Sequence, residues 1–220
     1  KVLMFNNRIY GLTKGQYSPT SQKGKITKSS PYGAVDYPFN PMSLALGSEA
    51  TFVAKTLDRD IKHMQEMIKK AAEHKGLAFI EIYQNCVIFN DGAFEKFTDK
   101  ETKADNVLVL EHGKPMVFGK NNDKAIKLEG FTPKIIDLND PNNSINDAWV
   151  HDEYDSNPIR AFILAHLVDH SGMPTPIGVY RNIRKETYDE AVVNQVEMVT
   201  TKKGKGDLKS LLYNANTWEV

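Results

Sequence analysis

The sequence lacks most features that mark a specialised class of protein. It has one cysteine, Cys86, in 220 residues, which excludes an internal disulfide and a metal site made of this chain's thiolates alone. Lysines and arginines equal aspartates and glutamates at 28 each, so no excess charge favours nucleic acid or an anionic membrane. No apolar run approaches the roughly 20 residues of a transmembrane helix, and no leader with a cleavage site opens the sequence. We expect a cytoplasmic protein that binds neither nucleic acid nor membranes.

What the sequence does contain is an ordinary globular composition. With 40% hydrophobic and 25% charged residues, 220 residues can bury one sizeable core with an appendage. The sequence opens at Lys1 directly on the apolar residues of an apparent buried strand, with no preceding cap or turn. We therefore expect a C-terminal part of a longer protein whose front half is missing.

The first part of the chain alternates strand and helix patterns. After the first strand, residues 13–41 form a loop rich in Gly, Ser, Thr, Lys and Pro, which is too long for a passive connection. Alternation of strands with helices predicts an α/β fold with a parallel sheet. The expected strands are Val2–Phe5, Ala50–Ala54 and Leu77–Tyr83, and the expected helices are Pro41–Leu46, capped by Asn40, and Ile61–Ala72, preceded by Asp58 and Asp60.

Beyond Phe94 the pattern changes. Short apolar runs separated by turn residues predict a small antiparallel meander, followed by a helix at Pro158–His170, an extended segment at Pro174–Asn182 and two further helices. We therefore divide the chain into residues 1–94 and 95–220. The runs of the meander are Val107–Leu110, Met116–Phe118 and Ala125–Leu128, and the last helices are Thr187–Met198 and Asp207–Tyr213.

Polar residues follow the first strand where a ligand would be expected. In open α/β sheets, ligands lie beyond the carboxyl ends of the strands, and Asn6 and Asn7 stand at that point. The Asn7 side-chain oxygen suits a hard cation. Backbone amides near Gly11 and the Thr13 hydroxyl suit phosphate oxygens. The alternative is a simple turn at a strand end, where Asn is common.

A longer stretch of sequence favours the ligand site. Residues 6–19 read NNRIYGLTKGQYSP, and this stretch resembles the thiamine-diphosphate loop of the β subunits of 2-oxoacid:ferredoxin oxidoreductases, in particular the 2-oxoglutarate type. The words DYPFNPMSLALG, ATFVAK and QNCVIFNDG agree in order and spacing, and the likeness is looser after Phe94. The resemblance implies a three-layer parallel sheet of the thiamine-diphosphate-binding type, present in part, with a smaller mixed C-terminal appendage. Residues 1–94 would be the C-terminal half of the cofactor-binding domain.

The resemblance also implies a role for each position of the loop. A magnesium ion would be held by the Asn7 side chain, the Ile9 carbonyl and an Asp from an upstream Gly-Asp-Gly word that this chain does not contain. Gly11, Leu12 and Thr13 would meet the diphosphate. Lys14 would neutralise or orient a substrate carboxylate, and the alternative for Lys14 is a solvated lysine.

Cys86 has two possible interpretations. A lone cysteine is commonly a small buried hydrophobe, but QNCVIFNDGAF resembles the family segment that supplies the fourth ligand of a [4Fe-4S] cluster. The other three thiolates would come from an N-terminal region, so we expect no cluster in these residues alone. His166 and His170, four apart on a predicted helix, could in principle share a zinc ion, but the adjacent Glu of the metalloprotease motif is absent.

The resemblance implies an activity for the whole protein. It would be the β subunit that, with an α subunit, decarboxylates a 2-oxoacid such as 2-oxoglutarate, forms an acyl-CoA from coenzyme A and reduces ferredoxin. These 220 residues would be inactive alone. Two alternatives stay open: a non-catalytic assembly module, and another thiamine-diphosphate-dependent lyase without the cluster.

Overall fold

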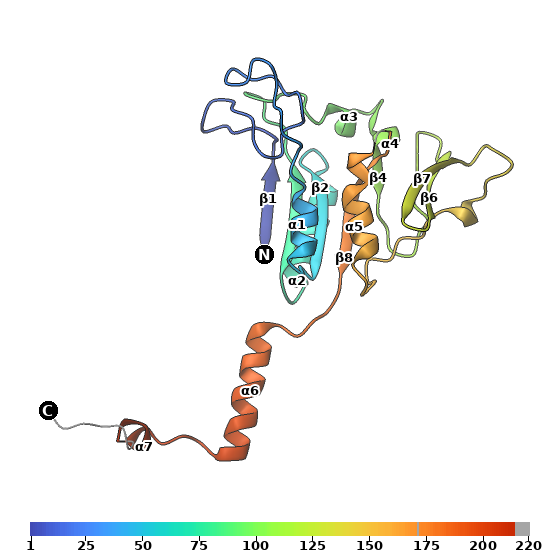
Figure 1. Cartoon of the computed structure of the whole chain (residues 1–220). Helices are drawn as coiled ribbons and strands as arrows, with labels where there is room; N and C mark the ends of the chain where they lie inside the picture. Colours follow the sequence, from blue (N-terminus) through green and yellow to red (C-terminus); the bar gives the residue numbers. More distant parts are fainter. Residues whose placement is uncertain (171, 214–220) are drawn as a thin grey trace. The chain divides into compact units, whose positions relative to one another are not determined.

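The larger part of the chain is built on one mixed sheet. The computed structural model describes residues 1–170 and 172–213 and divides into two compact units, residues 1–184 and residues from 185 onward. In the first unit (Figure 1), three neighbouring strands run parallel, the fourth is antiparallel to them, and the fifth is parallel to the fourth. In spatial order the strands are β1 (Val2–Asn6), β3 (Ala78–Tyr83), β2 (Phe52–Leu57), β8 (Thr175–Asn182) and β4 (Val107–Val109).

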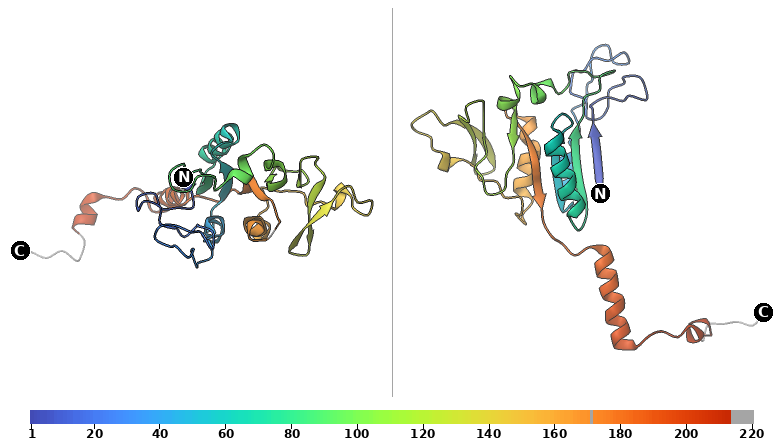
Figure 2. Two further views of the ribbon diagram at one scale, coloured as in Figure 1. Left: turned by 90° about the horizontal axis from the view of Figure 1, so that it is seen from above. Right: turned by 180° about the vertical axis from the view of Figure 1, so that it is seen from behind.

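Helices cover both faces of this sheet. The helix α2 (Ile61–Glu73) packs on one face, and α1 (Pro41–Gly47) and α5 (Ile159–His166) pack on the other (Figure 2). Side chains alternate along β2, so Val53 joins the core beneath α1 and α5 while Ala54 joins the core beneath α2. Every residue of β2 is buried. The predicted three-layer arrangement is confirmed.

The first two helices begin at the predicted caps. The Asn40 side chain accepts a hydrogen bond from the Ser43 amide at 3.1 Å, and Pro41 occupies the first turn. The Asp60 side chain accepts from the His63 amide at 3.3 Å. Each cap satisfies an amide that the helix itself leaves unpaired, which stabilises the helix by about 1 kcal/mol.

The predicted meander was wrong in one strand. The segment starting at Val107 is β4, which pairs with β8 in the large sheet, because Leu108 is apolar and packs fully buried in the core under α5. Gly178 of β8 has φ +120°, and a Cβ there would lie 2.8 Å from the Leu110 carbonyl oxygen. Glycine therefore permits this close approach. The small antiparallel sheet instead contains β5 (Val117–Phe118), β6 (Lys124–Glu129) and β7 (Thr132–Asp137).

The opening strand forms as predicted, but its side chains are not buried. β1 pairs only with β3 among the described residues and lies at the edge of the sheet. Val2, Leu3 and Phe5 are 44%, 42% and 61% exposed. The apolar run Val2–Phe5 correctly predicted a strand. The prediction that this strand is buried was wrong for the part of the chain that the structure describes.

Several short helices complete the first unit, and the second unit is helical. The predicted helix Pro158–His170 is α5 followed by a 3-10 turn.

The second unit has an exposed apolar stripe that includes Val192 and Val196. Among the described residues, no helix has the length and apolar character needed to cross a bilayer. The remaining elements are α3 (Glu95–Thr98), α4 (Lys103–Asn106), the 3-10 turns η1 (Ile145–Asp147) and η2 (Leu167–Asp169), α6 (Tyr188–Lys203) and α7 (Leu208–Leu212).

Stability of the first unit is expected to fall in mild acid. His151 is buried, and its Nε2 lies 2.7 Å from the Val179 carbonyl oxygen, so the neutral ring donates there. Burial lowers the pKa of His151 below its ordinary 6.5, and burial also lowers the pKa of His63. Below pH 6.5 the unfolded chain binds protons that the native chain does not, so stability decreases until the native imidazoles protonate. Urea unfolding at pH 7.5 and pH 5.5 measures this decrease.

His151→Gln provides the matched control, because it keeps an amide donor but does not titrate. The pH dependence of the urea midpoint should be shallower in this variant. The Asp60 carboxylate does not interfere, because the hydrogen bond from Lys103 lowers its pKa below 3.8, so its contribution is lost only in stronger acid. Stability equal at both pH values would contradict the prediction.

Candidate cofactor loop and its buried support

The chain turns sharply after β1. The Asn6 Oδ1 atom accepts a hydrogen bond from the Arg8 amide at 3.1 Å, and the Asn7 Oδ1 atom accepts from the Ile9 amide at 3.2 Å. Arg8 has φ +54°, in the left-handed region that a non-glycine residue seldom occupies. Two successive Asn side chains thus cap their own backbone two residues on, as Asn does in tight turns. The turn starts at the carboxyl end of β1.

Beyond the turn, residues 10–16 close into a short loop. The Lys14 amide donates to the Gly11 carbonyl and the Gly15 amide donates to the Tyr10 carbonyl, both at 3.0 Å. In the described part of the chain, the amides of Gly11, Leu12 and Thr13 have no acceptor, and Leu12 is 98% exposed. Consecutive unpaired amides at a loop tip form a concavity suited to an anion.

The glycine that this loop requires is Gly15. It has φ +97°, and a Cβ there would lie 3.2 Å from the Phe89 ring. At Gly11 a Cβ would lie 3.9 Å from the same ring, an ordinary contact. The loop conformation therefore requires a glycine at position 15, whereas a side chain at position 11 would meet only an ordinary contact.

A second segment, residues 86–90, lies against the loop from the end of β3. The Asn90 Nδ2 atom donates to the Asn7 carbonyl oxygen at 2.9 Å, and the Asn90 amide donates to the Cys86 carbonyl oxygen at 3.0 Å. Because β1 and β3 are parallel neighbours with Asn6 opposite Tyr83, both segments leave the same edge of the sheet. The Asn7 and Cys86 segments therefore lie side by side.

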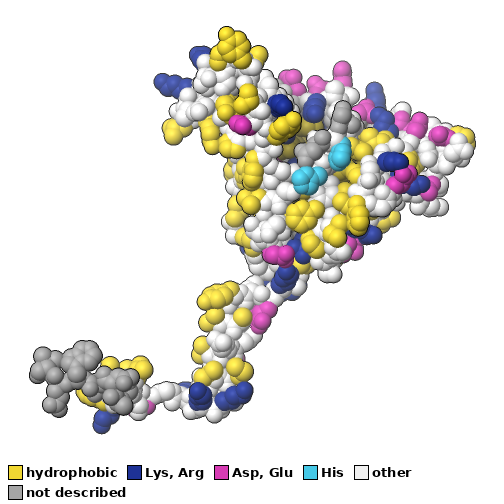
Figure 3. All heavy atoms as spheres, viewed as in Figure 1, with side chains coloured by type: hydrophobic (Ala, Val, Ile, Leu, Met, Phe, Trp, Pro, Cys, Tyr) yellow, Lys and Arg dark blue, Asp and Glu magenta, His cyan; other side chains and the backbone are white. Residues whose placement is uncertain are grey.

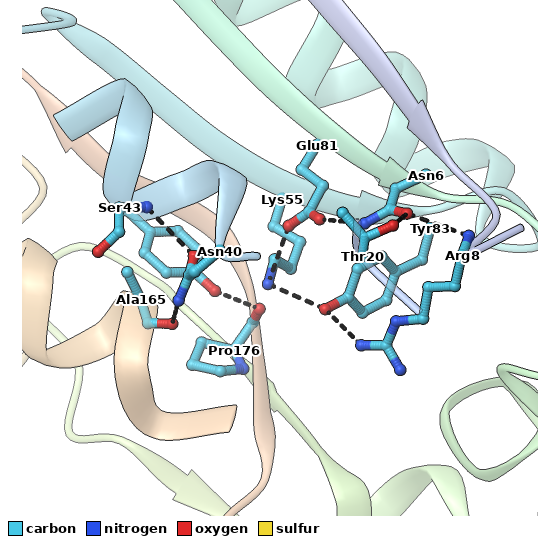
Figure 4. Close-up of polar contacts among 11 residues, drawn as sticks. Asn6, Arg8, Thr20, Asn40, Ser43, Lys55, Glu81, Tyr83, Ala165 and Pro176 are labelled. Atoms are coloured by element: carbon cyan, nitrogen blue, oxygen red, sulfur yellow. Dashed lines mark hydrogen bonds and ion pairs between the residues drawn. The ribbon is translucent and has the colours of Figure 1, made fainter. Parts of the chain in front are cut away.

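A buried ion pair lies beneath this edge, on the α1 side of the sheet (Figure 4). Lys55 of β2 and Glu81 of β3 stand opposite each other, their Nζ and Oε2 atoms are 3.1 Å apart, and both side chains are 2% exposed. The Asn6 Nδ2 atom donates to Glu81 Oε1 at 2.7 Å. Burial alone would lower the pKa of Lys55, but attraction to the Glu81 carboxylate outweighs it and raises the pKa. The Lys55 ammonium group is therefore charged at neutral pH.

Further polar contacts extend from this pair to the turn. The Lys55 Nζ atom and the Arg8 Nη2 atom both donate to the Tyr83 hydroxyl, at 3.3 and 3.1 Å. The Thr20 hydroxyl donates to Asn6 Oδ1 at 2.7 Å. A cavity of about 100 Å³ opens among these side chains. The side chain of Asn6 thus connects the ion pair to the Arg8 backbone.

The chain is similar to known thiamine-dependent enzymes and oxidoreductase subunits. Residues 1–82 match the family described as thiamine pyrophosphate enzyme, C-terminal TPP binding domain. The whole chain is 45% identical to the 2-oxoglutarate oxidoreductase subunit KorB of Mycobacterium tuberculosis, of which it spans 58%. Across 99 residues, 45% of this chain and 32% of the relative, it is 48% identical to the 2-oxoacid:ferredoxin oxidoreductase subunit beta of Saccharolobus solfataricus. The chain is related over its full length to the β subunits of 2-oxoacid oxidoreductases.

A solved structure agrees with this relationship. The 2-oxoglutarate:ferredoxin oxidoreductase from Magnetococcus marinus, with 2-oxoglutarate, coenzyme A and succinyl-CoA bound, superposes with a TM-score of 0.64 at 25% identity. The superposition covers 98% of this chain and 57% of that one. The predicted family and fold of the thiamine-diphosphate type are confirmed. The division at residue 94 stays a prediction.

The loop fits the roles that the likeness to these oxidoreductase subunits suggests, and those roles stay predictions. The amide oxygen of Asn7 and the carbonyl of Ile9 are ligands that magnesium accepts, and no described hydrogen bond ends on the Ile9 carbonyl. Lys14 has φ +60° and makes no ion pair with a described residue. Cys86 is half-buried and has a free thiol. In the described residues, no group of three or more His, Cys, Asp or Glu side chains could hold a metal ion, and His166 is therefore part of no such group.

Sequence reasoning missed the buried support. A signal was present, because Glu81 interrupts the otherwise apolar run of the expected strand Leu77–Tyr83, and Lys55 directly follows the expected strand Ala50–Ala54. A charge in such a strand needs a partner of opposite sign. Asn90 gave no comparable signal, since an Asn before Asp-Gly suggests only a turn.

Proposed function

We propose that this chain forms part of the β subunit of a 2-oxoacid:ferredoxin oxidoreductase. With a partner α subunit, the whole protein would oxidatively decarboxylate a 2-oxoacid, with 2-oxoglutarate as the first candidate, to an acyl-CoA and pass the electrons to ferredoxin. The observation that carries the proposal is the Asn7–Lys14 loop, with its unpaired amides, at the carboxyl end of β1 in a chain related to such subunits.

The residues of the loop suit thiamine diphosphate bound through magnesium. Asn7 and Ile9 would supply neutral oxygens to the ion, and the amides of Gly11, Leu12 and Thr13 would donate to the diphosphate. An oxygen ligand with charge, expected from a preceding segment of the whole protein, would complete the set. The cofactor supplies the electron sink for decarboxylation that ordinary side chains lack.

Lys14 would meet the substrate. It lines a groove of about 700 Å³ together with Gly15, Ile26, Ile88 and Phe89. Its ammonium group would attract a substrate carboxylate and orient it near the cofactor. Cys86 would be the fourth ligand of a [4Fe-4S] cluster whose other thiolates lie outside this chain.

The surface around the loop suits a partner subunit. Large apolar side chains lie exposed on residues 12–39, among them Leu12, Tyr32, Val35 and Tyr37, which are 98%, 101%, 77% and 78% exposed. Figure 3 shows hydrophobic side chains gathered over these loops. Exposed apolar patches of this kind mark interaction sites. The α subunit would cover the loops and complete the active site.

Activity of the full-length protein with its α subunit tests the proposal. With thiamine diphosphate, magnesium and coenzyme A present, 2-oxoglutarate should drive ferredoxin reduction, and omission of any one component should remove it. A panel of other 2-oxoacids identifies the preferred substrate. Failure to reduce ferredoxin with every 2-oxoacid would refute the proposed activity.

The second candidate is a non-catalytic assembly module. It is favoured by the sequence, because these 220 residues do not contain the Gly-Asp-Gly word whose Asp would bind the magnesium ion. Calorimetry on the 220-residue chain with thiamine diphosphate and magnesium separates the candidates in part. We expect no binding by this chain alone and tight binding by the full-length protein. Tight binding by the chain alone would exclude the module.

A further inference from the structure

We propose that residues 86–90 are a positioning element for the Asn7–Lys14 loop, with Asn90 as the positioning residue. The inference rests on the proposed function for what the loop binds, but its geometry stands on this chain alone. It assigns to Asn90 and Phe89 a role that complements the candidate ligands: they set the shape into which the cofactor fits.

Asn90 contacts the start of the loop. Its side chain is 5% exposed, and its Nδ2 atom lies 2.9 Å from the Asn7 carbonyl oxygen and 3.4 Å from the Arg8 carbonyl oxygen. One donor group thus fixes two successive peptide planes between the candidate metal ligands Asn7 and Ile9. The left-handed conformation of Arg8 is unfavourable by itself, and surrounding contacts of this kind maintain it.

The side-chain oxygen of Asn90 indicates which of its contacts account for an Asn at this position. Its Oδ1 atom is buried and makes no hydrogen bond in the described structure. A buried acceptor without a hydrogen-bond donor is unfavourable, so the residue is not optimal for stability. The donor contacts to the loop account for an amide at this position.

Phe89 packs against the same loop near its end. Its ring lies beneath Gly15, where a Cβ would come within 3.2 Å of it, and it also faces Gly11. Adjacent residues of one segment therefore contact both ends of the loop. A shift of that segment would move the candidate metal ligands and the diphosphate amides together.

The same segment begins at Cys86. The Asn90 amide donates to the Cys86 carbonyl oxygen at 3.0 Å, so the position of Asn90 depends on that of Cys86. A ligand that orders Cys86 would therefore favour the loop geometry, and by linkage a ligand on the loop would favour the ordered Cys86 segment by the same factor. The element couples two candidate cofactor sites through a single turn of chain.

Two variants of Asn90 test the role in the full-length protein with its α subunit. Asn90→Asp keeps the shape but places an oxygen against the two carbonyls, and Asn90→Ala removes the side chain. We expect each to weaken the binding of thiamine diphosphate with magnesium by about 10–100-fold, as for residues that orient metal ligands. Asn139→Ala, in an exposed loop, is the matched control and should bind as the wild type does.

Hydrogen exchange provides a readout independent of the cofactor. The amides of Tyr10, Lys14 and Gly15 are hydrogen-bonded within the loop, and they should exchange faster in the Asn90→Asp variant without cofactor, while amides of β2 keep their protection. If Asn90→Asp does not fold, Phe89→Leu and Asn90→Gln replace it. Unchanged exchange and unchanged affinity in the variants would overturn the inference. Absence of cofactor binding by the wild type would refute the proposed function instead, and the exchange comparison would still decide the positioning role.

Discussion

Replacing Glu81 by alanine is expected to lower the free energy of unfolding by about 3–5 kcal/mol, because it leaves the Lys55 ammonium buried without its counter-charge. Both side chains are 2% exposed and their charged atoms are 3.1 Å apart. The variant also removes the acceptor for the Asn6 side chain. Urea unfolding of wild type and variant at pH 7.5 measures the loss.

Two comparisons separate this effect from ordinary surface electrostatics. Glu66 forms an exposed i,i+4 pair with Lys70 on α2, so Glu66→Ala should cost less than about 1 kcal/mol. The double variant Lys55→Met with Glu81→Leu replaces the pair by apolar side chains and should recover much of the stability lost in Glu81→Ala. A loss below about 1 kcal/mol in Glu81→Ala would mean that water in the adjoining cavity already solvates the pair.

Local sequence patterns were sufficient to predict the helices and strands of the large sheet layer, but they were not sufficient to predict which strands pair. Asn40, Pro41 and Asp60 marked the starts of α1 and α2, because capping depends only on residues a few positions apart. The segment at Val107 was assigned to the wrong sheet, because a short apolar run has the same appearance in either one. Its choice of partner was decided by β8, some 70 residues later, where Gly178 admits it.

The candidate site shows the same division between local and distant information. Asn7 to Lys14 are contiguous, so a single word of sequence carried the prediction. Glu81, Thr20 and Asn90 reach the loop from other segments, and their contacts exist only after the strands pair in register. The exposure of β1 was likewise unpredictable, because an apolar strand has the same sequence pattern whether or not another chain or segment covers it.

Replacing Asn7 by alanine is expected to weaken magnesium-dependent binding of thiamine diphosphate by more than about 100-fold, beyond the effect of residues that only orient ligands. Alanine removes an oxygen that would contact the ion directly, and it also removes the acceptor for the Ile9 amide at 3.2 Å. Asn7→Asp keeps both an oxygen ligand and the acceptor, so it should retain binding. Calorimetry with the full-length protein and its α subunit, across a series of magnesium concentrations, measures these affinities.

The dependence of the lost affinity on magnesium concentration distinguishes a metal ligand from a residue that only shapes the turn. If Asn7 binds the ion, high magnesium should restore part of the affinity in Asn7→Ala, because mass action compensates for a weaker metal site. If Asn7 only shapes the turn, the affinity for thiamine diphosphate should remain low at every magnesium concentration and exchange of the Tyr10 and Lys14 amides should increase. Equal affinity of Asn7→Ala and wild type at limiting magnesium would exclude Asn7 as a ligand.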